Sequence, residues 1–344
     1  MRYSFFSVLA ALFCFTLHVH AQGSLLATLS HDGTISTFYG SSALRQAHAA
    51  AASGDIITLS SGNFIPVDIT KNITLRGAGT CVDVSQGLEP TVISGNFSID
   101  VPKDSTNRLT IEGIYCNFDI SYKNCSNAMF LKSRFKQITC YNNSANVLSN
   151  CSFIHCRISE YFYLGSNCSA SLINCAVEDP SASENTGLFE FVNCVITYND
   201  LYTDYVTYSS YKNCIISAKP NSSSFSNKIP SNCVAYNCVA ARSMSGYPLF
   251  GNMTNSTNSY SSYDELFTTY AGGGLGQLDS ETFELKEAAQ TKFLGTDGTQ
   301  VGIYGGSLPF DETPSNPQIT KCNVAAKSTA DGKLSVDIEV KAAE

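Results

Sequence analysis

The chain has 344 residues and a formal charge of −8 at pH 7, and its few Lys and Arg residues form no cluster. Nucleic-acid affinity comes mainly from Lys and Arg that neutralise phosphates, so this composition argues against a nucleic-acid partner. Trp is absent, whereas 18 Tyr, 20 Phe and many Asn, Ser and Thr residues indicate a β-rich chain with many short turns.

Residues 1–21 have the pattern of a secretory signal peptide. A basic residue is followed by an apolar run over residues 5–17, and then by small residues that end at Ala21. Loss of this segment removes Arg2, so the remaining chain carries one positive charge fewer, −9 in place of −8. No later run reaches the roughly 18 apolar residues of a membrane-spanning helix. We therefore expect a secreted protein, extracellular or periplasmic, without a membrane span.

A helix is predicted just before the first strand of the repeat region. Ser42 is a suitable N-cap and Gly54 a suitable C-cap, and residues 56–59 read as the first strand. The apolar residues on one side of this helix are Ala43, Leu44, Ala47, Ala50 and Ala51.

The central part of the chain repeats Asn-Cys followed by an apolar pair. The copies are "LSNCSF", "LINCAV", "FVNCVI", "YKNCII" and "AYNCVA", with successive cysteines 24, 19, 20 and 24 residues apart. Two weaker copies, "GIYCNF" and "FLKSRF", precede them, and Ser133 takes the place of Cys in the second. A period near 20 residues with variable spacing is typical of a solenoid in which each copy forms one turn.

Within each copy, apolar residues alternate with period 2, which indicates a half-buried strand. No helical pattern lies between the copies, so the strands are expected to stack in parallel. The cysteines assigned to the inner face of this ladder are Cys151, Cys175, Cys194, Cys214 and Cys238.

An asparagine precedes each of these cysteines, at the point where the chain must turn. Asn tolerates left-handed backbone conformations, and stacked amides can bond to one another along a ladder. The expected asparagine ladder consists of Asn150, Asn174, Asn193, Asn213 and Asn237.

These features together resemble the right-handed parallel β-helix superfamily, to which pectate lyases belong. Residues 71–80 look like the second turn of such proteins, and residues 281–306 are similar to the closing segment of many secreted bacterial members. The resemblance implies one all-β domain, a single-stranded right-handed parallel β-helix over residues 22–310, with the N-terminal helix capping its open end.

Residues 311–344 differ in composition from the repeats. "DETPSNPQ" is a Pro-rich link, and a β-hairpin that turns at Asp331-Gly332 is expected after it. A single hairpin is marginally stable alone, so we expect it to pack on the solenoid or cap it. A tail of this kind is similar to those of secreted Bacteroidetes β-helix proteins. The residues expected on its inner face are Leu334, Val336, Ile338 and Val340.

Thirteen cysteines remain after the signal peptide, and exported proteins usually pair them. Stacked turns place equivalent residues about 4.8 Å apart with parallel Cα–Cβ vectors, whereas a disulfide needs Cβ atoms about 3.8 Å apart that face each other. The ladder cysteines are therefore expected to be buried thiols, and no metal site is predicted because Cys-x-x-Cys does not occur. Isolated disulfides are the alternative for the cysteines off the ladder: Cys125, Cys140, Cys156, Cys168 and Cys233.

The resemblance makes an extracellular polysaccharide the first candidate partner, through binding or a non-standard lyase or hydrolase activity. The Asn-Thr-Asp, Asp-Asp and His-Gly phrases typical of polygalacturonase-like hydrolases do not occur. Glu178 and Asp179 are the candidate catalytic acids, although we expect them to be solvated charges in a loop over residues 178–190. A lyase-like reaction would use calcium beside the substrate carboxylate; no other cofactor is predicted.

Tyrosines are the most suggestive surface feature, because they offer sugars a flat apolar face and a polar rim. "YFYLG" at residues 161–165 and "TYNDLYTDYVTYSSY" at residues 197–211 are rich in them. The alternative is that several, Tyr211 among them, fill inward positions. The competing function is a non-enzymatic surface or adhesion protein that presents loops to a protein partner, and in either case we expect a monomer. The candidate sugar-contacting residues are Tyr198, Tyr202 and Tyr205.

Overall fold

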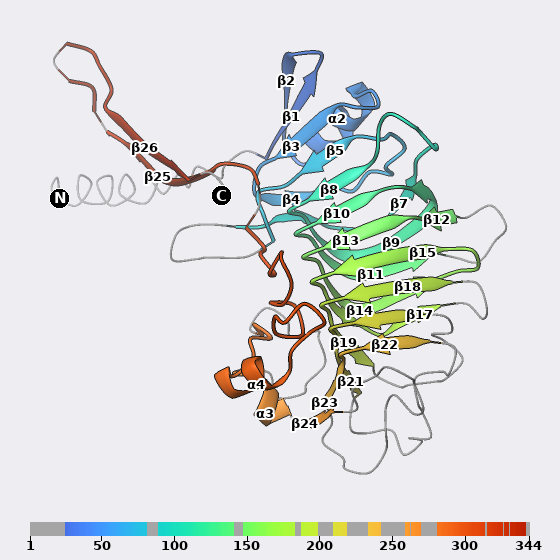
Figure 1. Ribbon diagram of the computed structural model, residues 1–344. Helices are drawn as coiled ribbons and strands as arrows, with labels where there is room; N and C mark the ends of the chain where they lie inside the picture. Colours follow the sequence, from blue (N-terminus) through green and yellow to red (C-terminus); the bar gives the residue numbers. More distant parts are fainter. Residues whose placement is uncertain are drawn as a thin grey trace, which may run out of the picture.

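The computed structural model describes residues 25–80, 89–140, 147–182, 187–198, 209–218, 233–241, 259–261, 263–269, 281–313, 315–325, 327–329 and 331–341. Its main body is a parallel β-solenoid of about seven turns, stacked along one axis (Figure 1). The predicted all-β solenoid is confirmed. Among the helices that the structure describes, none has the length and apolarity needed to span a bilayer.

Two sheets run along the solenoid, and a turn contributes a strand to each. Sheet A contains, in spatial order, β2 (Thr34–Tyr39), β1 (Leu26–His31), β3 (Ile56–Leu59), β5 (Thr74–Arg76), β8 (Thr110–Glu112), β10 (Met129–Leu131), β13 (Cys151–Ile154), β15 (Ser169–Ile173), β18 (Leu188–Val192), β20 (Ser210–Lys212) and β22 (Val234–Tyr236).

Sheet B follows the same axis. It contains β24 (Ser259–Ser261), β23 (Val239–Ala241), β21 (Ile215–Ala218), β19 (Val195–Tyr198), β16 (Ala176–Glu178), β14 (Arg157–Leu164), β11 (Arg134–Cys140), β9 (Tyr115–Ser126), β6 (Thr91–Ile93) and β4 (Gly62–Phe64), with β12 (Val147–Ser149), β17 (Pro180–Ala182) and β7 (Phe97–Asp100) beside this path.

The first edge of sheet A is covered by a hairpin that the sequence did not predict. Strands β1 and β2 pair antiparallel, and β1 also pairs antiparallel with β3. A helix, α2 (Ala43–Ala50), lies next to them, and its Ala43, Leu44 and Ala47 are fully buried in the core; its C-cap is Ala51 and not the expected Gly54, and Ala50 is exposed. The antiparallel pairing of β1 with β3 occupies backbone N–H and C=O groups of β3 that could otherwise hydrogen-bond to a strand of another chain.

The interior is filled by aromatic rings and thiols in successive turns. The rings of Phe130 and Phe153 stack at 4.5 Å between centroids, and those of Phe191 and Tyr211 stack at 5.1 Å. Each stacked pair of this kind contributes about 0.5–1.5 kcal/mol beyond the burial of its area. The eleven cysteines whose side chains the structure describes are all buried and in the thiol form, as expected for the ladder.

The register of the ladder differs from the predicted alignment at one copy. Arg157 of β14 pairs with Ala176 of β16, so Cys156, just before β14, is aligned with Cys175, just before β16. The Cys156 N–H donates to the Cys175 sulfur at 3.4 Å. Cys151 instead pairs with Ala170 in sheet A. The placement of Cys151 and Asn150 in the same column as Cys175 and Asn174 was therefore wrong, because "NCSFIHC" offers two cysteines five residues apart.

The corner between the two sheets has left-handed backbone in turn after turn. Asn is favoured there because its short polar side chain tolerates positive φ, although Lys132 and His155 adopt it as well. We call this row the left-handed corner; its members and φ angles are Lys132 (48°), His155 (55°), Asn174 (50°), Asn193 (52°), Asn213 (57°) and Asn237 (49°).

A C-terminal segment is fastened along this corner on the outside of the solenoid (Figure 1, orange to red). We call residues 281–313, with 315 and 316, the strap; it includes α4 (Glu287–Lys292) and follows α3 (Tyr263–Leu266). It passes the turns in reverse chain order. Its hydrogen bonds and ion pairs join Leu294 O to Asn237 Nδ2 (3.1 Å), Thr296 N to Asn213 Oδ1 (2.8 Å), Ile303 O and Gly305 O to Asn174 Nδ2 (2.7 and 2.8 Å), Leu308 O to His155 Nε2 (3.1 Å) and Asp311 to Lys132 (2.8 Å).

The strap changes the interpretation of the asparagines. In the described residues, the amides of Asn174, Asn213 and Asn237 bond to strap backbone and not to one another. An amide pair between turns occurs at Asn150 and Asn127, at 2.7 Å. The expectation of amides bonded to each other along the predicted ladder was thus wrong for Asn174, Asn213 and Asn237, because strap backbone groups bond to their amides.

The strap also buries an apolar strip on the outer side of sheet B. Outward residues of three stacked strands, Val195, Ile215 and Val239, are buried. Their burial extends the hydrophobic core beyond the interior of the solenoid. The cluster around this strip contains Phe283, Leu285, Ala289, Phe293, Val301, Ile303 and Phe310 of the strap, together with Leu266 of α3 and Phe267.

The predicted C-terminal hairpin is present as β25 (Gln318–Val324) and β26 (Val336–Lys341), with Gly332 at φ 77° in its turn. It extends away from the solenoid in Figure 1, and residues 331–340 are all exposed. The expected packing of its apolar side on the solenoid was wrong in this structure, since Val336 and Val340 face solvent.

Candidate functional site

The long strands of sheet B align polar residues in columns on its outer side. Ile120, Ile138 and Phe162 face the core, so their neighbours along the strands face outward. We call this outer surface the polar face. Its two columns are Asp119, Gln137 and Tyr161, and Ser121, Thr139, Tyr163 and Ser181; Thr139 and Ser181 are buried within it.

Two tyrosines form the centre of the polar face. Tyr161 and Tyr163 lie two residues apart on β14, and their rings are 6.1 Å apart between centroids with planes within 8° of parallel. The Ser181 hydroxyl hydrogen-bonds to the Tyr161 hydroxyl at 2.8 Å. Two rings held side by side in one orientation present an extended aromatic surface with hydroxyls at its rim.

Neighbouring polar groups are also held in place. Gln137 donates its amide Nε2–H to the Thr139 hydroxyl at 3.3 Å, and the Asp119 backbone N–H donates to Asn96 Oδ1 at 3.2 Å. Lys136 and Glu160 form an ion pair at 3.5 Å. These contacts limit rotamer freedom, which lowers the entropic cost of contacting a ligand.

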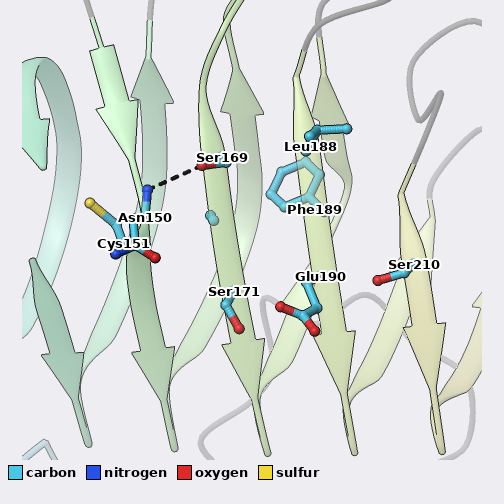
Figure 2. Close-up of a pocket in the computed structure, with 9 residues that line it drawn as sticks. Asn150, Cys151, Ser169, Ser171, Leu188, Phe189, Glu190 and Ser210 are labelled. Atoms are coloured by element: carbon cyan, nitrogen blue, oxygen red, sulfur yellow. Dashed lines mark hydrogen bonds between the residues drawn. The ribbon is translucent and has the colours of Figure 1, made fainter. Parts of the chain in front are cut away.

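A shallow hollow lies on the other sheet, across β13, β15, β18 and β20 (Figure 2). It has a volume of about 310 Å³. Ser171, Glu190 and Ser210 occupy one column, with the carboxylate between the two hydroxyls. Glu190 is the single acid among the residues that line it, so the hollow does not contain the acid and base pair that glycoside hydrolysis uses.

The structure does not place the predicted catalytic acids in this hollow. Glu178 ends β16 and is 4% exposed, and Asp179 follows it with φ 44°. The expected solvated loop over residues 178–190 was wrong for Glu178, because the chain forms β16 up to that residue. Glu178 pairs in register with the buried Thr197 of β19.

The predicted sugar-contacting tyrosine Tyr198 is a core residue. It is 3% exposed and its hydroxyl hydrogen-bonds to that of Tyr211 at 3.0 Å; burial raises its pKa. The assignment of Tyr198 to a glycan surface was therefore wrong, whereas the inward alternative for Tyr211 is confirmed. Tyr202 and Tyr205 lie outside the described residues.

Tyr161 and Tyr163 were part of the tyrosine-rich pattern but were not selected. The signal that distinguishes them is the alternation "YFYL", in which Phe162 and Leu164 take the buried positions and leave both tyrosines outward. In the described part of the chain, no three His, Cys, Asp or Glu side chains come together as metal ligands, and the calcium site stays a prediction.

No family model, no curated protein and no solved structure matches the chain. The two surfaces therefore have to be compared by their chemistry. The hollow offers a carboxylate and hydroxyls, whereas the polar face adds two parallel aromatic rings and a longer row of polar groups across β9, β11 and β14.

Proposed function

We propose that this protein is a secreted member of the pectate-lyase-like right-handed β-helix superfamily that binds an extracellular polysaccharide on the polar face. The observation that carries the proposal is the parallel pair of Tyr161 and Tyr163 on the outer side of β14. Sugar rings have apolar C–H faces that pack on aromatic rings, and hydroxyl rims that need hydrogen-bonding partners.

The surroundings of the two tyrosines suit a linear chain of sugars. Asp119 and Gln137 continue the column of Tyr161, and Ser121 continues that of Tyr163 beyond the buried Thr139. Both columns run along the solenoid axis, and in the column of Tyr161 an extended polymer can meet partly exposed groups at successive strands about 4.8 Å apart. Because Asp119 stands within this surface, we propose a neutral polysaccharide in preference to a polyanionic one.

Binding without cleavage is the form of the proposal that the geometry supports best. Glu190 is one acid in an open hollow, and Glu178 is buried in a strand. Both inverting and retaining hydrolysis require two carboxyl groups on either side of the scissile bond.

A protein-contacting adhesion role is the second candidate function. The observation that favours it is the exposed apolar side of the C-terminal hairpin, formed by Leu334, Val336, Ile338 and Val340. A surface of that composition is typical of protein contact and not of sugar contact.

The test is a binding screen against soluble neutral polysaccharides, pectin and alginate, with purified full-length protein. Tyr161→Ala and Tyr163→Ala are each expected to weaken binding about fivefold, equivalent to about 1 kcal/mol. Tyr39→Ala, an exposed tyrosine on β2, is the matched control and should leave the affinity unchanged. Equal affinity in all three variants would contradict the proposal.

The same screen should follow new reducing ends and the absorbance of unsaturated products. We expect neither to rise. Turnover that disappears in a Glu178→Gln, Asp179→Asn double variant would replace the binding proposal with catalysis at that pair.

A further inference from the structure

Two buried cysteines, Cys140 and Cys168, have their sulfur atoms in very short contact. The Sγ atoms of Cys140 and Cys168 are 2.8 Å apart. The Sγ atoms of Cys125 and Cys151 are 3.9 Å apart. The ladder thiols, Cys194 for example, point to backbone carbonyls, with its sulfur 3.3 Å from the Val192 oxygen. The sulfur contact of Cys140 and Cys168 is therefore about 1.1 Å shorter than that of Cys125 and Cys151, and it joins two cysteines off the ladder.

The reason lies in where the two residues stand in the repeat. Cys140 ends β11 and its register partner in the next turn is Leu164. Cys168 lies four residues beyond Leu164, in the turn that leads into β15. The two are not equivalent positions of stacked strands, so the parallel Cα–Cβ vectors that prevent bridging within the ladder do not apply to them.

We propose that Cys140 and Cys168 form a disulfide bond when the chain folds in an oxidising medium that contains a low-molecular-weight disulfide. The sulfur atoms need to approach by about 0.8 Å to reach the bond length of about 2.05 Å. The bond closes a loop between residues 28 positions apart. That loop contains β12, β13 and all of β14, including Tyr161 and Tyr163.

The local electrostatics favour Cys168 as the attacking sulfur. A hydrogen bond from the Cys140 thiol is the largest influence and lowers the pKa of Cys168 to about 7, against the opposing effect of burial. The Leu148 N–H also donates to the Cys168 sulfur at 3.4 Å. The same thiol contact, together with burial, raises the pKa of Cys140. The thiolate, not the thiol, is the nucleophile in exchange.

The exchange proceeds in two balanced steps. The Cys168 thiolate attacks one sulfur of the small disulfide, forms a mixed disulfide and releases one small thiolate. The Cys140 thiol loses its proton to solvent, and its sulfur attacks the Cys168 sulfur and releases the second small thiolate. Two cysteine thiols are thereby oxidised while one small disulfide is reduced to two thiols. Both sulfurs are buried in the completed fold, so the exchange takes place late in folding, in a state where the Cys140 thiol already contacts Cys168 and the small disulfide still reaches it.

Peptide mapping tests the bond directly. The denatured full-length chain is refolded with a glutathione redox mixture, blocked with N-ethylmaleimide and digested without reduction. Chymotryptic cleavage after Phe, Tyr and Leu separates the two cysteines from all others, in "KQITCY" (residues 136–141) and "GSNCSASL" (residues 165–172). The expected product is the linked pair of these peptides, lost on reduction. Alkylation of both cysteines in protein with native circular dichroism would overturn the proposal.

Variants provide a second, independent measurement. Reductant is expected to lower the thermal midpoint of the oxidised wild type, because the cross-link restricts the unfolded chain. Cys140→Ser should start at the lower midpoint and show no further response to reductant. Cys125→Ser is the matched control, since its 3.9 Å neighbour is expected to stay a thiol, and it should keep the full response. A reductant response that persists in Cys140→Ser would overturn the proposal. The bond does not depend on the proposed function, and its failure would leave the polysaccharide screen unaffected.

Discussion

Glu312→Gln tests how the strap is held to the solenoid. The Glu312 carboxylate accepts Nε–H and Nη2–H from Arg134 at 3.1 and 3.3 Å, and from Arg157 at 2.8 and 3.2 Å. The side chains of Glu312, Arg134 and Arg157 are 13%, 12% and 7% exposed. One carboxylate thus joins two nearly buried guanidinium groups on adjacent strands β11 and β14.

The substitution keeps the shape of the side chain and removes its charge. Two arginines then lie close together with no carboxylate between them. The amide N–H₂ that replaces one carboxylate oxygen is itself a donor, and it faces the N–H donors of the arginines. Removal of one partner from a buried ion pair typically costs 3–5 kcal/mol. Since this cluster keeps slight solvent contact and Gln retains one acceptor oxygen, we expect a loss of about 3 kcal/mol in stability. The loss should favour release of the strap and not unfolding of the solenoid.

Hydrogen exchange measures this release. The Gly302 N–H donates to the Asn213 carbonyl at 2.9 Å and reports on the strap. A loss of about 3 kcal/mol should accelerate its exchange on the order of 100-fold, with interior strands unaffected. Glu160→Gln removes the exposed ion pair with Lys136 and is the matched control, expected to change stability by less than about 0.5 kcal/mol. Exchange at Gly302 within twofold of wild type in Glu312→Gln would refute the reasoning.

Two further predictions concern the left-handed corner and His48 of α2. Gly306→Ala should destabilise the attachment of the strap by about 1–3 kcal/mol, because residue 306 has φ +80° and an added Cβ meets the Asn193 amide. Gly298→Ala, at φ +79° with open space around it, should show in the same exchange assay only the smaller destabilisation that comes from backbone strain. Burial is the main cause that lowers the pKa of His48, whose Nε2 accepts the Thr70 N–H at 3.3 Å. The unfolded chain therefore binds this proton first, so stability is complete above about pH 6.5 and declines below it. The urea midpoint of wild type should fall more between pH 7.5 and 5.5 than that of His48→Gln, and equal falls would contradict this.

The architecture was predictable because its signals are local. Period-2 alternation and the recurrence of Asn-Cys indicate stacked strands, and Asn174, Asn193 and Asn213 do adopt the left-handed backbone that their chemistry favours. Register was harder, since Cys151 and Cys156 both fit the repeated phrase and only pairing with neighbouring turns distinguishes them.

The strap and the candidate surface depend on contacts between distant parts of the chain. Val195, Ile215 and Val239 occupy outward positions yet are apolar, which was the available sign that another segment covers them. Tyr198 and Tyr161 look alike in a tyrosine-rich sequence. They differ because Tyr198 is buried in the structure and bonds to Tyr211, whereas Tyr161 shares its strand with the inward Phe162.

The strap has a consequence for how this repeat protein can change in evolution. An open solenoid gains or loses whole turns easily, because each turn contacts only its neighbours. Here one chain segment of fixed length reaches from Asn237 to Glu112, with its own residues matched to particular turns between them. Duplication or deletion of a turn within that span would move every later strap residue away from the turn that it contacts. We expect the number of turns in this region to be inherited unchanged, with variation directed to loop lengths.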